Sequence, residues 1–139
     1  MAQTVFPYLL YEDVSAMLDW LSRVFGFEEK LRFAGEDGTI SHAEMSIGGG
    51  SIMMGAPGGD YRSPKHGGGF PAQVQVYLDD VDDHYARAKA AGAEIRQEPT
   101  EMPYGDRRYD AYDAEGHLWM FATQIRKVAP EDWGATTAG

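Results

Sequence analysis

Hydrophobic and polar residues recur along this chain with two periods, one typical of helices and one typical of strands. Apolar residues return every three or four positions across residues 14–25 and, in a narrower stripe, across residues 81–88. This spacing places them on one face of a helix, so the pattern predicts two amphipathic helices. The residues that suit the ends of these helices are Asp13 and Asp80 as N-caps and Gly26 and Gly92 just past the C-termini.

Short runs rich in aliphatic and aromatic residues, several of them alternating with polar residues, predict strands. The last two runs are joined by Asp113–Gly116, whose Asp and Gly residues favour turn dihedral angles, so we expect a closing hairpin. The expected strands are Val5–Tyr11, Phe27–Phe33, Ile40–Ile47, Ser51–Gly55, Gln73–Leu78, Ala93–Glu98, Arg107–Tyr112 and Leu118–Thr123.

The order strand–helix–three strands occurs twice, which indicates an internal duplication. Asp13-Val14 matches Asp80-Val81 at an offset of 67 (80 − 13), and Gly50–Met54 matches Gly116–Met120 at an offset of 66 (116 − 50). A half of about 65 residues makes a marginal core by itself, so we expect the two sheets to pair.

The duplication predicts one α+β domain over residues 1–125. We assign module one to 4–56, a connecting loop rich in Gly and Pro to 57–70, and module two to 71–125. Residues 126–139 have no hydrophobic period and are expected to form a loosely held C-terminal extension, which Trp133 can anchor.

Composition restricts the classes of partner and the cellular compartment that we expect for this protein. The net charge of −10 repels phosphate backbones, so nucleic acid is not an expected partner, and it favours cationic ligands unless it serves solubility alone. The chain has no cysteine, hence no disulfide and no thiolate metal site, which fits a cytoplasmic protein. No apolar run approaches the roughly 20 residues that span a bilayer, and no export signal is expected at the N-terminus.

The duplicated βαβββ order resembles the vicinal oxygen chelate superfamily, which includes glyoxalase I, extradiol dioxygenases and bleomycin-resistance proteins. The resemblance covers about residues 4–125, and similar segments occur in the bacterial subgroup named after PhnB. It implies two paired βαβββ modules forming a curved eight-stranded mixed sheet around a cavity, and a homodimer with its cavities near or across the interface. The segments that carry it are His42-Ala43-Glu44-Met45, Tyr104-Gly105-Asp106-Arg107 and Asp113-x-x-Gly116-His117-x-Trp119.

In that superfamily the central strands each supply one metal ligand. Carried over one position at a time, the resemblance places these ligands at Phe6, Met54, Gln73 and Met120. None of these side chains suits the zinc, nickel or iron sites of the family, which are built from imidazole and carboxylate. We therefore expect no metal and no other cofactor, and an apolar, polarizable pocket floor instead.

Other residues offer competing roles. His42 and Glu44 lie two apart on one strand face and can share a contact, so with His66 from the loop they are candidates to rebuild a metal site; otherwise they form a local polar pair. Arg107 can bind a ligand carboxylate or phosphate in a bidentate manner, or pair with Asp106 or Asp113. His117 and Trp119 are expected to be structural: a turn anchor and a packing residue.

The expected cavity lining is rich in aromatic, thioether and amide groups, which suit a flat organic ligand. We therefore predict a metal-independent small-molecule-binding protein of the bleomycin-resistance type that sequesters an aromatic or cationic compound. The alternatives are a metal-dependent glyoxalase-like lyase or isomerase, a dioxygenase-type enzyme, and metal-free acid–base catalysis through Glu44 or His42. The lining residues are Tyr8, Met54, Gln73, Gln75, Tyr77, Tyr109 and Met120.

Overall fold

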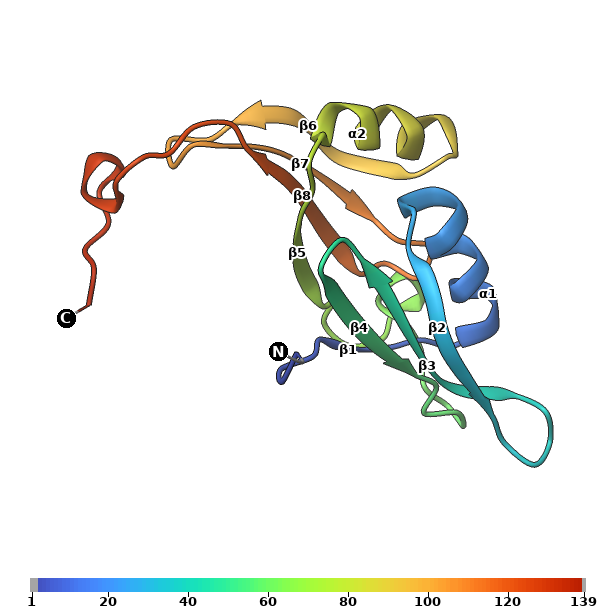
Figure 1. Ribbon diagram of the computed structural model, residues 1–139. Coiled ribbons are helices and arrows are strands. Elements are labelled where there is room, and N and C mark those ends of the chain that lie inside the picture. The colour runs from blue at the N-terminus through green and yellow to red at the C-terminus, as the bar shows by residue number, and fades with distance from the viewer. Residues whose placement is uncertain (1–2, 139) are drawn as a thin grey trace.

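The computed structural model describes residues 3–138 and contains two βαβββ modules in succession (Figure 1). Residues 1–2 and 139, assigned above to the domain and to the extension, lie outside the described part of the chain. Module one comprises β1 (Tyr8–Leu10), α1 (Val14–Trp20), β2 (Glu28–Ala34), β3 (Ile40–Ile47) and β4 (Gly50–Gly55). Module two comprises β5 (Gln73–Tyr77), α2 (Val81–Ala90), β6 (Glu94–Glu101), β7 (Asp106–Tyr112) and β8 (Leu118–Gln124).

Both helices begin at the predicted N-caps. Asp13 accepts a hydrogen bond from the amide of Ala16, and Asp80 accepts one from the amide of Asp83, which satisfies amides that lack a partner inside the helix. After Trp20 the first helix widens into a π-helical turn, Leu21–Phe25, and ends at Gly26, whose φ of 80° favours glycine. The predicted helix over 14–25 is thus present as two consecutive segments.

The first predicted strand is shorter than its hydrophobic run, which spans Val5–Tyr11. The Pro7 carbonyl still accepts a hydrogen bond from Met53, but proline has no amide with which to extend the ladder towards the N-terminus. The loop between the modules contains one short 3-10 turn, Pro64–His66. A second 3-10 turn, Pro130–Trp133, lies in the C-terminal extension. Neither α1 nor α2, the α-helices of residues 3–138, has the length and hydrophobicity that crossing a membrane requires.

The strands form two mixed four-stranded sheets of the same topology, β1-β4-β3-β2 and β5-β8-β7-β6. The predicted α+β architecture of paired βαβββ modules is confirmed, and its eight strands are divided between two sheets that are not closed into one. We call the boundary between edge strand β1 of the first sheet and edge strand β5 of the second sheet the seam. His117 bridges it, because its Nε2–H donates to the Leu10 carbonyl and its Nδ1 accepts from the Ala72 amide, both at 2.8 Å.

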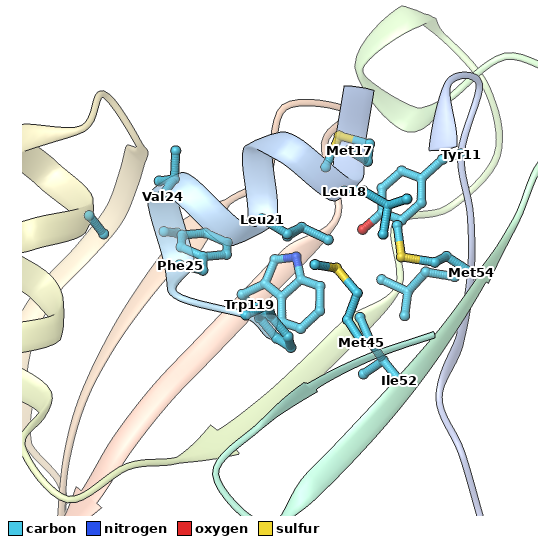
Figure 2. Close-up of a cluster of buried hydrophobic side chains, with 14 of the residues drawn as sticks. Tyr11, Met17, Leu18, Leu21, Val24, Phe25, Met45, Ile52, Met54 and Trp119 are labelled. Carbon is cyan, nitrogen blue, oxygen red and sulfur yellow. The ribbon is translucent and has the colours of Figure 1, made fainter. Parts of the chain in front are cut away.

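The hydrophobic core lies between the helices and one face of each sheet. Met45, Ile52 and Met54 of the first sheet pack beneath α1, where they meet Trp119 from β8 of the second sheet (Figure 2). The Phe25 ring also lies 4.8 Å from that of Phe121. The first helix therefore packs on both sheets, which fixes how the two modules sit relative to each other.

Candidate ligand-binding surface

The two sheet faces that point away from the helices form the surface that we call the open face. Alternation along the strands assigns side chains to it: Tyr8 and Leu10 are exposed, whereas Leu9 between them is buried. Paired residues on neighbouring strands share a face, so the ladder extends each assignment across its sheet. One row across the first sheet contains Tyr8, Met53, Glu44 and Leu31, and one row across the second contains Gln75, Met120, Asp110 and Gln97.

These two rows are equivalent parts of the duplication. In the parallel ladders β1 pairs with β4 at a step of 45 residues (Tyr8 with Met53), and β5 pairs with β8 at the same step (Gln75 with Met120). Tyr8 therefore corresponds to Gln75, and Met53 corresponds to Met120. The centre of the open face is built from a phenol, an amide and two thioethers.

Each row also holds an ion pair made by a β-bulge. The register shifts between Glu29 and Leu31 in β2 and between Ile95 and Gln97 in β6, and the intervening residues are Lys30 and Arg96. These cations pair with the carboxylates on the adjacent strands: Lys30 Nζ lies 3.8 Å from Glu44, and Arg96 Nη1 lies 3.0 Å from Asp110.

Asp110 is the more constrained of the two carboxylates. Its side chain is only 1% exposed and also lies 3.2 Å from Arg108 Nε. That nitrogen and Asp110 Oδ1 are both buried and face each other without hydrogen-bond alignment. The attraction between them is therefore mainly electrostatic.

Most of the predicted lining residues lie on the open face or at its edge, but two predictions are wrong. Met54 and Tyr109 are 0% exposed and belong to the hydrophobic core, where Met54 packs beneath α1 and Tyr109 contacts Tyr85 of α2. The methionine of β4 that faces outward is Met53. Those on the open face or beside it are Tyr8, Gln73, Gln75, Tyr77 and Met120, with the half-buried Phe6 just before β1.

The candidates for a rebuilt metal site do not converge. His42 Nδ1 lies 3.0 Å from the Tyr8 hydroxyl, while Glu44 faces Lys30. His66 is held elsewhere, with its Nδ1 2.7 Å from Glu12. Among residues 3–138, no three His, Cys, Asp or Glu side chains gather closely enough to hold a metal ion. The four expected ligand positions hold phenyl, thioether and amide groups, so the residues present do not fit the divalent ion of the superfamily.

Arg107 points to the helix side of its sheet rather than to the open face. Its Nε and Nη2 donate hydrogen bonds to the Asp82 carboxylate of α2 at 3.0–3.1 Å. This hydrogen bonding, more than the charge of Asp82, raises the pKa of Arg107. The expected alternative to ligand binding was an ion pair with Asp106 or Asp113, and the partner is in fact a residue of the neighbouring helix.

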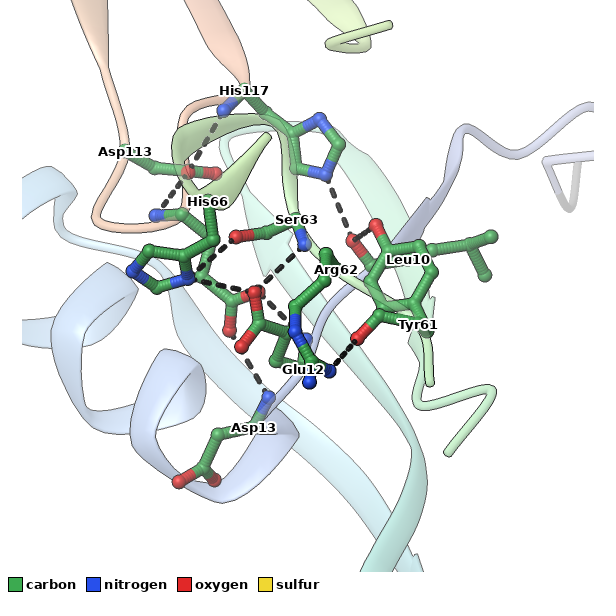
Figure 3. A network of polar contacts seen from close by, with 10 residues as sticks. Leu10, Glu12, Asp13, Tyr61, Arg62, Ser63, His66, Asp113 and His117 are labelled. Atoms are coloured by element: carbon green, nitrogen blue, oxygen red, sulfur yellow. Dashed lines mark hydrogen bonds and ion pairs between the residues drawn. The ribbon is translucent and has the colours of Figure 1, made fainter. Parts of the chain in front are cut away.

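The Asp113 carboxylate organises the hairpin turn beside the seam. Its Oδ2 accepts from the Tyr11 hydroxyl at 2.6 Å and from Trp119 Nε1 at 2.9 Å, and its Oδ1 accepts from the amides of Glu115 and His117. The structural roles predicted for His117 and Trp119 are thereby confirmed. Figure 3 shows the polar network around this turn.

Glu115 and Glu12 extend the network to the connecting loop. The Glu115 carboxylate accepts from the amides of Glu12 and Asp13, and Glu12 accepts from the Ser63 amide at 2.7 Å (Figure 3). Burial raises the pKa of Glu115, whereas hydrogen bonds from Ser63, followed by the His66 contact, lower that of Glu12 to about 2. Glu12, Ser63 and Glu115 were not among the functional or structural residues predicted from the sequence.

Two cavities open along the seam. One, of about 340 Å³, lies between β5 and the beginning of β4 and is lined by Ile52, Val74, Gln75 and Tyr77 among others. The other, of about 320 Å³, lies at the opposite end, between β1 and the connecting loop. Met53, Tyr61, Phe70 and Asp110 were not among the residues predicted from the sequence. The 67-residue offset of the N-caps, subtracted from Met120, would have identified Met53 (120 − 67).

Comparison with known proteins places this geometry in a family. The model of the Glyoxalase/Bleomycin resistance protein/Dioxygenase superfamily matches residues 3–121. An uncharacterized protein of Mycobacterium bovis is 30% identical over 127 residues, which cover 88% of this chain and 84% of that protein.

Solved structures agree with this assignment. TioX from Micromonospora sp. ML1 is 40% identical with a TM-score of 0.72, covering 91% of this chain and all of that one (100%). A glyoxalase-related enzyme from Clostridium phytofermentans has a TM-score of 0.69 at 12% identity, covering 90% of this chain and 97% of its own, which supports the fold alone. The chain therefore belongs to the glyoxalase/bleomycin resistance protein/dioxygenase superfamily.

Proposed function

We propose that this protein is a metal-independent small-molecule-binding protein that sequesters an aromatic or cationic compound on its open face. The observation that carries the proposal is the chemistry of the four central side chains, Tyr8, Met53, Gln75 and Met120. Thioethers adapt their shape and polarise against aromatic rings, and the phenol and amide add a few directional hydrogen bonds. Such a surface suits a flat organic ligand.

The remaining polar groups of the open face support binding rather than Lewis-acid chemistry. Glu44 and Asp110 face cations of their own chain, and His42 contacts the Tyr8 hydroxyl. A metal ion would have to displace these partners and would then still lack imidazole or carboxylate on β1, β4, β5 and β8.

The formal charge of −10 favours a ligand that carries positive charge, because the field of the whole protein attracts it. In the proposed mechanism the ligand is held and no covalent bond changes. Its affinity comes mainly from buried apolar area, at about 25 cal/mol per Å² before the cost of association.

The test measures ligand-induced thermal stabilisation and calorimetric binding with bleomycin and with a planar cationic dye of the acridine type. We expect at least one of these compounds to stabilise the protein, and we expect Met53→Ala and Met120→Ala to weaken its binding. Met102→Ala, in the turn between β6 and β7, is the matched control and should bind normally. Absence of stabilisation by any compound of this class, or equal binding by all three variants, contradicts the proposal.

Metal independence has its own test. Protein purified without chelators is analysed for nickel, zinc and iron, and we expect no stoichiometric metal. A stoichiometric metal that is lost with activity on dialysis against a chelator would instead favour the lyase, isomerase or dioxygenase class.

We further propose that the protein acts in the cytoplasm as a homodimer. Support comes from apolar side chains on the outer strand of the first sheet, since Phe33 is 61% exposed and Leu31 lies beside it on the same face. Light scattering should give twice the mass of the chain, and Phe33→Glu should shift the protein towards monomer. A monomer at all accessible concentrations contradicts this part of the proposal.

A further inference from the structure

The cavity of about 320 Å³ at the loop end of the seam has tyrosine and phenylalanine residues from separate segments in its lining. Tyr8 comes from β1, Tyr61 from the connecting loop, and Phe70 from the residues that lead into β5. The Tyr61 hydroxyl donates to the Leu10 carbonyl at 3.1 Å, which fixes that ring against the edge of β1 (Figure 3). The rings thus belong to segments that only the tertiary structure brings together.

Carboxylates act on one wall of this cavity. Its lining, all within the described part of the chain, contains no Lys, Arg, Asp or Glu. His117 adds no charge in the tautomer that its hydrogen bonds require, with Nε2–H donating and Nδ1 accepting. Burial first, and then the charges of Glu115, Glu12 and Asp113, raise the pKa of Tyr61, so a negative potential reaches its hydroxyl.

One basic residue lies next to Tyr61 in the chain. The Arg62 guanidinium donates to the Tyr61 carbonyl at 3.0 Å and does not line the cavity (Figure 3). Its guanidinium therefore binds a backbone carbonyl and is not part of the cavity lining.

Phe70 lies at the cavity with its side chain 98% exposed. The preceding residue, Gly69, has open space where a Cβ would be. An exposed phenyl group gains by covering apolar or cationic ligand surface, because closure removes its ring from water. Phe70 is therefore placed so that its ring can cover a ligand bound in the cavity.

We propose that this cavity is a subsite for an alkylated ammonium group, which the faces of Tyr8, Tyr61 and Phe70 recognise. The inference rests on the proposed binding function and adds which group of the ligand is recognised and where. An aromatic ring presents a negative face, and a desolvated ammonium close to several such faces is attracted to all of them. A negatively charged group would be repelled here, and a neutral group of the same shape would gain only apolar contact.

The experiment compares choline with its neutral isostere, in which a carbon replaces the quaternary nitrogen. Both are titrated into the full-length protein while the ring resonances of tyrosine and phenylalanine are followed by NMR. We expect choline to bind about tenfold more tightly or better, which is the range of a cation–π contribution in a partly desolvated site. Shifted resonances should include those of Tyr61 and Phe70.

Variants identify the subsite. Phe70→Leu and Tyr61→Leu keep an apolar side chain and remove an aromatic face, so they should reduce the preference for the cation several-fold. Tyr61→Phe keeps the ring and should retain the preference even though it loses the hydrogen bond to Leu10. Trp133→Leu, which removes an exposed aromatic ring from the C-terminal extension, is the control and should bind choline as the parent protein does.

Equal binding of choline and the isostere overturns the inference, as does a cation preference that survives both leucine variants. These outcomes are distinguishable from failure of the proposed function. Should bleomycin or the acridine-type dye still bind in a manner that depends on Met53 and Met120, the open-face function stands without this subsite. Cation-selective binding that is lost in Phe70→Leu supports the subsite even when neither larger compound binds.

Discussion

Glu44 and Asp110 occupy equivalent places in the two modules: each lies opposite an outward-facing methionine and pairs with a cation supplied by a β-bulge. The offset is 66 residues for the carboxylates (110 − 44) and for the cations Lys30 and Arg96 (96 − 30). The duplication has therefore kept a polar pair as well as a fold. Its two copies differ in burial, and this difference has measurable consequences.

Removing the charge of Asp110 should destabilise the protein more than removing that of Glu44. Asp110→Ala leaves Arg108 beside an empty site in a buried position and should cost about 3 kcal/mol or more. Glu44→Ala breaks a longer pair with a half-exposed lysine and should cost about 1 kcal/mol or less. Urea unfolding of the two variants measures the difference. Equal losses would show that the bulge pairs are energetically alike.

Adjacent methionines of β4 should respond in opposite ways. Met54→Ala opens a cavity beneath α1 and should lower the free energy of unfolding by about 3 kcal/mol without changing ligand contacts. Met53→Ala should cost about 1 kcal/mol or less and reduce ligand affinity instead. Chemical denaturation and calorimetric binding of both variants check this. A larger loss of stability for Met53→Ala would contradict the assignment of the two faces.

Asp113→Asn should weaken the hairpin turn and the seam together. An amide cannot accept on both sides, so donors among Tyr11, Trp119 and the turn amides are left without a partner. We expect a loss of about 2 kcal/mol or more, together with a change in tryptophan fluorescence. Asp37→Asn is the control, because Asp37 caps an exposed turn at Thr39, and it should change stability by less than about 0.5 kcal/mol.

The anchoring of the connecting loop should depend on pH through Glu12. Its pKa is lowered from 4.5 to about 2, chiefly by hydrogen bonds from Ser63, so the ionised form stabilises the folded state. That contribution is fully present above pH 4.5 and is lost as the pH falls towards 2. Glu12→Gln should therefore lower the melting temperature at neutral pH, with a difference from the parent protein that shrinks on acidification.

The comparison with Glu12→Gln is needed because the pKa of Glu115 is shifted in the opposite direction to that of Glu12. Its pKa is raised by burial, so protonation of Glu115 favours the folded state as the pH falls through the raised value. The acid profile of the parent protein alone mixes the two effects. A difference between parent and Glu12→Gln that stays constant from neutral pH to pH 2 would show that Glu12 does not anchor the loop through its charge.

The fold was predictable because its signals are local. Each signal involves residues that lie close together in the chain. These signals are the helix caps at Asp13 and Asp80, the helical spacing of apolar residues that follows each cap, and the alternation of apolar and polar residues in the strands. The duplication then followed from their order. The structural roles of His117 and Trp119 were accessible for the same reason, since both lie in a hairpin whose turn is recognisable from its residues.

The open face was only partly predictable because it depends on register. Aligning Gly50 with Gly116 gave an offset of 66 and selected Met54, whereas the ladders place Met53 at 67 from Met120 (120 − 53). The second hairpin turn is one residue longer: Tyr112 pairs with Leu118, whereas in the first module Ser46 pairs with Ser51. A shift of one residue moves a side chain to the other face of a sheet, and this one moved a methionine from the core to the surface.

The sequence by itself determined the elements, their duplication and the absence of ligating side chains from the central strands. The tertiary structure decided which methionine faces outward, which cation each carboxylate meets, and that Tyr8, Tyr61 and Phe70 surround one cavity. The physical reason is the distance along the chain over which each kind of interaction acts. Helix periods and caps act over a few residues. Strand register, bulges and tertiary packing join residues more than a hundred positions apart, as Tyr11 and Asp113 show.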